Sequence, residues 1–486
     1  MNKNRRGGAK KQNPGQLKKR AAHDPLFPEQ FVSFMLQGWS PEKKRSVKPV
    51  AGLVHYRKRR RVLSTQMGRM LLVIPGGGEV RRSSDTHYRF RAGSDLFYLT
   101  GHKEPDAVLV LVPASGRRHA RSILFLPADI GRTSPGFFAD RDRGELWVGK
   151  RLGPNQAKKR YGVDEAYPLE DLEVFLKKAG KKRAVLRGIC SKTDAMLGKS
   201  SSLDHDLRVT LSGMRLCKDA LEVAALQRAA RATLKAYDAL VAAIPTAKNE
   251  RDLEAAFGMQ ARLYGDDVGY GTIVAAGSHA CVLHWTNNDG ALKRGDLVLI
   301  DAGVESDALY TADVTRVFPV SGKFTSVQRQ VVELVLKAQA AAMRVIKPGA
   351  AFLDPHRAAM RVLAEGLIAW EILGCTLEEA LDPKNMFYRR YTLHGTSHML
   401  GLDVHDCSEA PMSRYRDGKL EPGMVITVEP GLYFQEDDRT VPRAFRGIGV
   451  RIEDDVLVTP KGHRNLTHAI PKTPDDVEAW MKQLRR

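Results

Sequence analysis

Four carboxylates stand in or directly after apolar, strand-like runs in the C-terminal half of the chain. Asp301 follows Leu-Val-Leu-Ile, Glu429 follows Val-Ile-Thr-Val and Glu453 follows Val-Arg-Ile, while Asp313 lies inside the run 309–320. Taken alone, each of them is more simply interpreted as a surface carboxylate at the end of a strand. Together they constrain the fold strongly, because carboxylates in apolar surroundings need a partner charge or a metal.

A thirteen-residue stretch between these runs, HGTSHMLGLDVHD at 394–406, holds three imidazoles and two carboxylates. If the stretch is extended, His394, His398 and Asp406 share one side, because side chains alternate along a strand. His405 then points to the other side unless a bulge or turn re-aims it. Read in isolation, the stretch is equally compatible with a polar loop that carries surface histidines.

Convergence of the four carboxylates with His398 would create strong mutual repulsion. Arg316 and Arg451 are the nearby cations, and they offset two of the four charges at most. Two divalent cations would balance the carboxylates and leave room for one hydroxide, whereas a single ion would require proton uptake. Oxygen-rich ligation with one imidazole favours manganese and leaves zinc, cobalt and iron open. A water held between two such ions becomes a nucleophile at neutral pH.

The length of 486 residues predicts two domains. In the first, residues 62–212, one helix is expected over 169–179, and the apolar runs predict strands at 70–74, 96–99, 107–112, 122–126 and 184–186, with 107–112 central. Strands interleaved with helices indicate an α/β domain. It holds no cluster of metal-ligand residues, so we expect a structural or substrate-limiting role.

The second domain, residues 213–486, has four long helical patterns. They cover 219–243, 250–264, 327–346 and 355–373, with Asp219 as the expected N-cap of the first. Strand-like segments lie at 272–276, 282–285, 297–300, 309–320, 424–429 and 449–459. Helices on one side of a largely antiparallel sheet indicate an α+β fold.

Residues 1–61 form a basic extension, with 17 Lys or Arg against 3 Asp or Glu, and thus +14 of the total net charge of +21. We expect residues 1–24 to be disordered and residues 25–41 to hold a short helix. Basic residues could bind polyanions non-specifically. Because no nucleic-acid-binding motif is present, we expect no specific nucleic-acid partner.

The five cysteines are few, widely spaced and without a CxxC pair, which favours a reducing compartment over a disulfide framework or a zinc site. No apolar run approaches the roughly 20 residues of a membrane span. The basic N-terminus lacks the apolar region of a secretory signal. We therefore expect a cytoplasmic protein with no membrane partner, and an organellar transit peptide stays open.

Five ordered motifs resemble those of aminopeptidase P, the Xaa-Pro aminopeptidase of the pita-bread metallopeptidases. They are IDAG (300–303), ADVTR (312–316), the stretch 394–406, TVEPGLY (427–433) and GIGVRIEDD (447–455). DTHYRFR (85–91) and FYLTG (97–101) resemble the N-terminal domain of that family. The resemblance spans roughly residues 67–467 and implies a C-terminal pita-bread domain preceded by an α/β domain.

By this resemblance, the ligands of two divalent metal ions, with Mn²⁺ favoured, would be Asp301, Asp313, His398, Glu429 and Glu453. Asp313 and Glu453 would bridge the ions, Asp301 would complete one site, and His398 and Glu429 would complete the other. Glu429 would also be the general base. The implied reaction is release of the N-terminal residue from peptides with proline second, by attack of a metal-bridging hydroxide.

The resemblance assigns further residues to the substrate. His284 would contact it, His405 would stabilise the tetrahedral intermediate, and His394 would line the proline pocket. Arg451 and Tyr433 would support the active-site network. Without the resemblance, His284 reads more simply as a partly buried structural histidine. The resemblance also leads us to expect a homo-oligomer, a dimer or tetramer.

Two alternatives remain open from the sequence. One is a prolidase restricted to dipeptides, since prolidases share these ligands. The other is a metal-free pita-bread binding protein that uses its basic extension on nucleic acid, although all five ligand positions are retained. Many family members have one residue fewer between the two ligand aspartates. We expect the turn at 305–308 to absorb the extra residue and leave both aspartates pointing inward.

Overall fold

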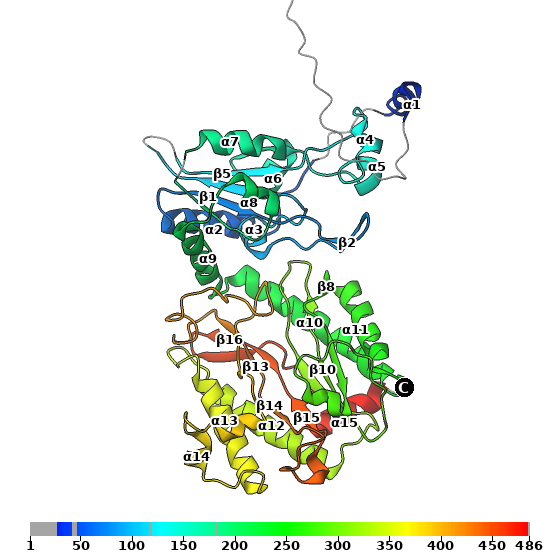
Figure 1. Ribbon diagram of the computed structural model, residues 1–486, viewed down its shortest axis with the longest axis vertical. Helices are drawn as coiled ribbons and strands as arrows, with labels where there is room; N and C mark the ends of the chain where they lie inside the picture. The colour runs from blue at the N-terminus through cyan, green and yellow to red at the C-terminus, as the bar shows by residue number, and fades with distance from the viewer. Residues whose placement is uncertain (1–26, 41–45, 116–118, 181, 485–486) are drawn as a thin grey trace, which may run out of the picture.

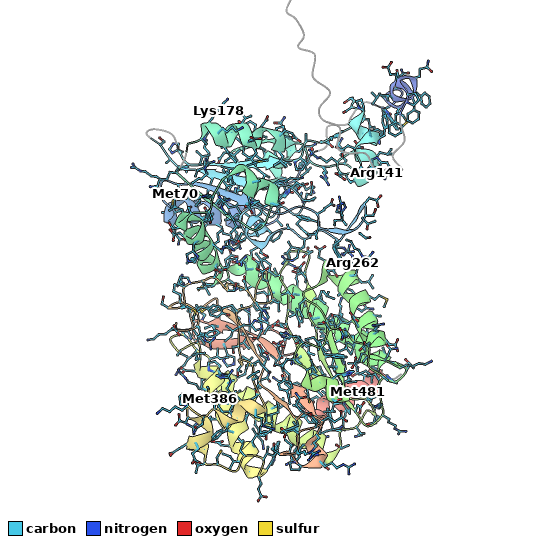
Figure 2. All side chains as sticks on the ribbon, viewed as in Figure 1. Met70, Arg141, Lys178, Arg262, Met386 and Met481 are labelled. Atoms are coloured by element: carbon cyan, nitrogen blue, oxygen red, sulfur yellow. The ribbon has the colours of Figure 1, made fainter. Side chains whose placement is uncertain are left out.

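The computed structural model describes residues 27–40, 46–115, 119–180 and 182–484 (Figure 1). The tail predicted for residues 1–24 lies outside this range. Two layered units are stacked along the long axis of the molecule, and α9 (Ser202–Arg215) lies where they meet. In Figure 2, Met70 and Lys178 mark the N-terminal unit, and Met386 and Met481 mark the C-terminal one.

The N-terminal unit is built on a five-stranded mixed sheet with the order β6-β5-β4-β1-β7. β4 pairs antiparallel with β1 and β5, whereas the two outer strands pair parallel with their neighbours. The predicted central position of residues 107–112 is confirmed, because β4 stands in the middle. The strands are β1 (Leu71–Pro75), β4 (Val108–Val112), β5 (Arg121–Leu126), β6 (Glu165–Pro168) and β7 (Arg183–Val185).

Alternate side chains of these strands reach opposite faces of the sheet, as the period of two requires. Leu72 and Ile74 lie on the face of the sheet that α2 (Leu53–Gln66) and α9 cover. Leu71 and Val73 lie on the opposite face, which α7 (Leu172–Lys178) covers. The result is a three-layer α/β unit, as predicted.

Two segments of the N-terminal unit differ from the prediction. Residues 96–99 are not a strand but part of helix α3 (Ser94–Thr100), which glycines flank on both sides and which is buried from Leu96 to Thr100. A short apolar run buried all round has no period by which to tell helix from strand. Residues 53–61, placed in the basic extension, belong to α2, where Arg59 and Arg60 are buried.

Shorter elements complete this unit. The predicted short helix near the N-terminus is α1 (Glu29–Met35), and the rings of Phe27 and Phe31 lie 5.2 and 5.8 Å from that of Phe138. The others are β2 (Arg81–Ser83), β3 (Thr86–His87), α4 (Gly136–Ala139), α5 (Glu145–Val148), α6 (Pro154–Tyr161), η1 (Leu169–Asp171) and α8 (Ser191–Met196).

The C-terminal unit consists of antiparallel strand pairs covered by helices (Figure 1). One sheet has the order β12-β10-β9 and another β13-β16-β17, with β14-β15 and β11-β8 as two-stranded pairs. Their bounds are β8 (Asp267–Val268), β9 (Ile273–Ala276), β10 (Leu297–Asp301), β11 (Val304–Glu305), β12 (Thr315–Pro319), β13 (Val425–Val428), β14 (Gly431–Tyr433), β15 (Gly449–Arg451), β16 (Asp454–Thr459) and β17 (Gly462–Asn465). The predicted α+β class is confirmed.

Two helix pairs cover these sheets, and their amphipathic patterns were visible in the sequence. Asp219 caps the first helix as predicted, accepting hydrogen bonds from the backbone N–H groups of Leu221 and Glu222. The predicted strand at 282–285 is wrong, because these residues form a turn and its edge. The helices are α10 (Ala220–Ala243), α11 (Glu250–Tyr264), α12 (Ser326–Val345), α13 (Asp354–Ala369), α14 (Leu377–Leu381) and α15 (Pro474–Leu484), with 3-10 turns η2 (Gly277–Cys281), η3 (Phe387–Arg390) and η4 (Arg443–Phe445).

Partly buried ion pairs join the two units. Arg59 of α2 lies 2.8 Å from Asp219 and 3.1 Å from Glu222, and Arg91 lies 2.5 Å from Glu305. These contacts anchor the N-terminal unit to the start of α10 and to β11. Among the described residues, no helix has both the length and the apolar character that crossing a bilayer requires.

Candidate metal centre

The first two predicted ligands approach each other at the end of the β10–β12 pair. Asp301, the last residue of β10, faces Thr315 in the antiparallel register, and Asp313 stands two residues before Thr315. Both carboxylates reach the hydroxyl of Tyr270, with Oδ1 of Asp301 at 2.6 Å and Oδ1 of Asp313 at 2.5 Å. The two aspartates therefore converge despite the additional residue between them.

Glycine at position 303 lets the two segments cross. A Cβ atom there would lie 1.7 Å from the carbonyl oxygen of Ala312, so a side chain would force the segments apart. The turn at 305–308 carries Asp307 and Ala308 outward in a loop closed by the Ser306–Tyr310 backbone hydrogen bond. The tip of this turn therefore lies away from the two carboxylates.

The other three predicted ligands come from separate segments. Nε2 of His398 lies 3.4 Å from Oδ2 of Asp313 and 3.4 Å from Oε1 of Glu429. Glu453, between β15 and β16, accepts a 2.7 Å hydrogen bond from the hydroxyl of Thr315. Asp313, His398 and Glu453 each offer a ligand atom, and these three atoms lie within 4.8 Å of one another.

The stretch 394–406 is extended only in part. Residues 396–400 run antiparallel to β13, where the backbone N–H groups of Thr427 and Glu429 donate to the carbonyl oxygens of His398 and Thr396 at 3.0 and 2.9 Å. The stretch turns at Gly401, where a Cβ atom would meet Oδ2 of Asp406 at 2.1 Å. Asp406 does not share a side with the histidines, because it is buried against Arg215 and Lys218 at 3.1 and 3.2 Å. The turn brings the rings of His405 and His398 to 4.5 Å.

A chain of polar contacts links the predicted substrate residues to Asp301. Nε2 of His394 lies 2.7 Å from the hydroxyl of Tyr433, which accepts a 3.0 Å hydrogen bond from Arg451. A second nitrogen of Arg451 donates to Oδ2 of Asp301 at 2.5 Å, and its Nε donates to Thr315 at 3.0 Å. Arg451 therefore fixes the relative positions of these groups.

His284 occupies an exposed turn and forms no hydrogen bond or ion pair with the carboxylates among the described residues. Burial is the main cause of two lowered pKa values in this region. It lowers the pKa of His394 to about 3, and it also lowers the pKa of His405. The charge of His284 acts in the same direction on both pKa values.

The electrostatics of the centre call for added positive charge. Burial raises the pKa of Glu429 to about 7, raises that of Asp301, and raises that of Glu453 well above its ordinary value. Burial alone would lower the pKa of His398, but the hydrogen bond to Asp313 and the charge of Glu429 raise it to about 9. Buried carboxylates that resist ionisation beside an imidazole are a donor set that fits divalent cations.

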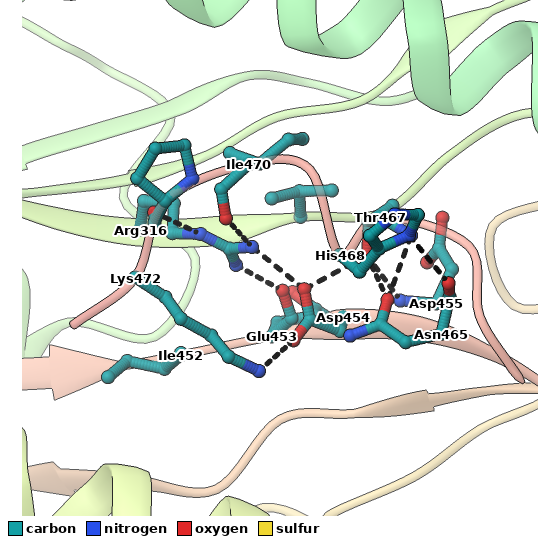
Figure 3. Close-up of polar contacts among 12 residues, drawn as sticks. Arg316, Ile452, Glu453, Asp454, Asp455, Asn465, Thr467, His468, Ile470 and Lys472 are labelled. Atoms are coloured by element: carbon teal, nitrogen blue, oxygen red, sulfur yellow. Dashed lines mark hydrogen bonds and ion pairs between the residues drawn. The ribbon is translucent and has the colours of Figure 1, made fainter. Parts of the chain in front are cut away.

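A buried network holds the backbone beneath the centre (Figure 3). Arg316 and Asp454, exposed by 1% and 0%, form a 2.7 Å ion pair, and Arg316 also donates to the carbonyl oxygen of Glu453. Lys472 adds a 2.6 Å contact to Asp454. Arg316 therefore compensates Asp454 rather than the predicted ligands, which leaves Arg451 as the guanidinium in contact with them.

Sequence reasoning missed several residues that orient the ligands. Tyr270 stands between Gly269 and Gly271, and only its contacts reveal its role. Thr315 joins Glu453 to Arg451, and Asp455 accepts from the backbone N–H of Asp313 at 3.2 Å. The acidic run at 453–455 was a signal in the sequence, but nothing there distinguished the ligand from its two neighbours.

Comparison with known proteins agrees with this arrangement. Residues 224–460 match the model of Metallopeptidase family M24, and residues 56–186 match that of the aminopeptidase P N-terminal domain. Xaa-Pro aminopeptidase 1 of Streptomyces coelicolor is 44% identical over 465 residues, which cover 95% of this chain and 94% of the relative.

Solved structures show the same fold. Escherichia coli aminopeptidase P in complex with substrate has a TM-score of 0.80 and 33% identity, covering 90% of this chain and 100% of that chain. A zinc-substituted form of that enzyme in complex with product has a TM-score of 0.80 and 34% identity, covering 90% and 99%. The chain belongs to metallopeptidase family M24, in its aminopeptidase P branch, with the N-terminal domain typical of that branch.

Proposed function

We propose that this protein is a metal-dependent Xaa-Pro aminopeptidase that releases the first residue from peptides with proline second. The observation that carries the proposal is the convergence of Asp313, His398 and Glu453, with ligand atoms within 4.8 Å, beside Asp301 and Glu429. The names of the relatives support the substrate class, since they match this chain over nearly their full length.

Asp301, Asp313, His398, Glu429 and Glu453 would hold two divalent ions, with Mn²⁺ favoured by the oxygen-rich donor set. The ions would polarise the scissile carbonyl and supply a nucleophilic water at neutral pH. The zinc-substituted relative supports a site of this type that accepts more than one metal. Arg451 would hold Asp301 in its ligating orientation through the contact already described.

Glu429 would accept the proton of the attacking water and transfer it to the leaving nitrogen. Its raised pKa of about 7 suits a group that must exchange a proton near neutral pH. His405 would donate a hydrogen bond to the developing oxyanion, and His284 would contact the substrate backbone. Both are exposed, so a peptide can reach them.

His394 would line the pocket for the proline ring, oriented by Tyr433. Proline on the leaving side has no amide N–H, so its recognition depends on ring shape and apolar contact. Burial keeps His394 neutral by lowering its pKa to about 3, so its ring would present a largely uncharged surface to the proline at neutral pH.

The decisive test is hydrolysis of an Arg-Pro-Pro peptide by protein stripped with a chelator, with manganese, zinc and cobalt restored separately. We expect release of arginine only after metal is restored, and no cleavage of the matched Arg-Ala-Pro peptide. Absence of activity with all three metals, or equal cleavage of both peptides, would contradict the proposal.

A dipeptide-restricted prolidase shares the ligands, and the comparison of Arg-Pro with Arg-Pro-Pro separates the two. We expect the tripeptide to be cleaved with the higher kcat/KM. A metal-free protein that binds nucleic acid and cleaves neither peptide would instead support the binding-protein alternative.

We also propose a division of labour within the chain. Residues 213–486 would carry catalysis, and residues 62–212 together with α2 would limit access to the site, with the basic extension preceding them. We propose a cytoplasmic location, supported by five free cysteines, and a homo-oligomer, dimer or tetramer. Exposed Phe387 and Leu393 are candidate contacts between subunits, and light scattering after size-exclusion chromatography measures the assembly.

A further inference from the structure

A cavity of about 800 Å³ lies in the N-terminal unit between α2 and the adjoining ends of β4 and β5. None of the residues assigned above to the metal centre lines it. Its wall includes six charged side chains, those of Arg57, Arg60, Arg61, Arg69, Arg121 and Asp164. This volume falls in the range of small-molecule sites.

The wall is strongly cationic, with five arginines against the single carboxylate of Asp164. Oδ2 of Asp164 already accepts from the backbone N–H and the hydroxyl of Ser122, at 2.7 and 2.8 Å. Arg121 pairs with Glu165 outside the wall at 2.5 Å. Within the part of the chain that the structure describes, Arg57, Arg61 and Arg69 form no ion pair, so most of this positive charge is uncompensated.

Helical spacing places the cavity-lining side chains of α2 on one side of the helix. Residues 57, 60, 61, 64, 65 and 68 recur at intervals of three and four, so they share one side of α2 and the turn that follows it. Ser64 adds a hydroxyl group between the guanidinium groups, whereas the Thr65 hydroxyl donates to the carbonyl oxygen of Arg61 at 3.0 Å. A regular helix therefore presents the cations and the Ser64 hydroxyl to the cavity together.

Arg60 is the buried member of the set, exposed by only 5%. It donates to the carbonyl oxygens of Leu99 at 2.7 Å and Gly162 at 2.8 Å, and no described carboxylate forms an ion pair with it. Burial lowers its pKa to about 10, and Arg57 acts in the same direction against the opposing charge of Asp164. A buried cation held only by neutral dipoles is costly unless an anion binds nearby.

Gly162 is what lets these arginines approach the end of α6. Its φ is +56°, and a Cβ atom would lie 2.8 Å from Nε of Arg57. Arg57 and Arg60 therefore cap the C-terminus of α6 as well as lining the cavity. Arg61 and Arg69 have no such structural contact among the described residues, which makes them the informative positions to change.

We propose that this cavity binds a small polyphosphate anion, either inorganic pyrophosphate or the phosphate end of a nucleoside polyphosphate. Guanidinium groups bind phosphate oxygens in a bidentate manner, and several around one cavity suit a ligand with more than one phosphate. The wall has no aromatic ring on which a base could stack. Recognition therefore rests on the phosphates.

Isothermal titration of the full-length, metal-loaded protein with pyrophosphate, ATP and inorganic phosphate tests this site. We expect saturable binding of pyrophosphate or ATP, with inorganic phosphate weaker. ATP tighter than pyrophosphate would identify the nucleotide as the source of the phosphates, and the reverse order would identify inorganic pyrophosphate. In the double variant Arg61→Ser/Arg69→Ser, we expect binding to weaken by about tenfold or more, since hydrogen bonds to charged groups contribute strongly.

The matched control is Arg231→Ser/Arg251→Ser, which removes two exposed arginines from α10 and α11 and changes the net charge equally. It also controls for capture of pyrophosphate by the catalytic metals, which both double variants retain. Equal peptidase activity of the two variants verifies folding. Equal affinities in the two variants, no saturable binding by the unchanged protein, or binding of RNA alone would each overturn the proposal.

Discussion

The phenolic oxygen of Tyr270 lies 2.5 Å from Oδ1 of Asp313. The same oxygen lies 2.6 Å from Oδ1 of Asp301. A phenol carries one proton and can donate to only one of these carboxylates at a time. A proton on one carboxyl, or a cation between the two, must satisfy the second contact. The relationship ties Tyr270 to the charge state of the metal centre.

Tyr270→Phe should therefore weaken metal binding or activity by about 10- to 100-fold, the range expected for a group that orients ligands. Metal titration followed by peptide hydrolysis measures both effects. Tyr264→Phe, on the exposed side of α11, is the matched control and should leave both unchanged. If Tyr270→Phe kept full metal affinity and activity, the hydroxyl would have no role in positioning the aspartates.

Glu429→Gln should lower kcat by about 10²- to 10⁴-fold, because the amide cannot accept the proton that the carboxylate takes up. Metal content should be measured in the same sample, since Glu429 is also a proposed ligand. Glu436→Gln removes an exposed carboxylate seven residues away and should behave like the unchanged protein. Retention of more than a tenth of the activity by Glu429→Gln would exclude it as the general base.

Arg316→Met should lower the free energy of unfolding by about 3–5 kcal/mol, because Asp454 would remain buried with only Lys472 opposite it. Urea unfolding measures the change. Arg357→Met breaks the 3.1 Å contact to Asp354, a pair whose side chains are 66% and 39% exposed, and should cost less than about 1 kcal/mol. Similar losses in the two variants would show that burial does not set the strength of the Arg316 pair.

His102 should make the free energy of unfolding decrease as the pH falls. Burial lowers its pKa from 6.5 to about 4 in the folded protein. The unfolded chain therefore binds the proton first as the pH falls, and stability is lost from about pH 6.5 down to about pH 4. Between pH 7 and pH 5, protonation of His102 should lower the free energy of unfolding by roughly 2 kcal/mol.

Unfolding of His102→Leu at both pH values isolates this contribution, because the variant should lose correspondingly less stability on acidification. His87→Leu, at an exposed position, serves as the control and should keep the full dependence. An identical pH dependence in the unchanged protein and in His102→Leu would mean that His102 does not titrate differently in the two states.

Removal of metal should lower the melting temperature, because the ions bind the folded state and offset repulsion among buried carboxylates. At a hundredfold excess over Kd, one bound ion contributes about 2.7 kcal/mol. Calorimetry with and without chelator, followed by restored manganese, measures the effect. An unchanged melting temperature would indicate that Arg451 and protons alone balance the charge.

Much of the fold could be predicted from local sequence patterns. The long helices, the N-cap at Asp219 and the central strand β4 follow from apolar periodicity and capping chemistry, which are properties of neighbouring residues. The errors lie where no period exists. Residues 96–99 are buried on all sides, and the arginine-rich residues 53–61 looked like a solvated tail although Arg59 and Arg60 are buried.

The sequence by itself determined which side chains could form a metal centre, because carboxylates inside apolar runs require compensation wherever the chain places them. Only the tertiary structure decided which cations meet which anions. Arg316 forms an ion pair with Asp454, and Arg451 forms one with Asp301. Asp406 pairs with Arg215 and does not lie beside the histidines. These partners lie more than a hundred residues apart in the chain, and Coulomb attraction between such residues acts only after folding has brought them together.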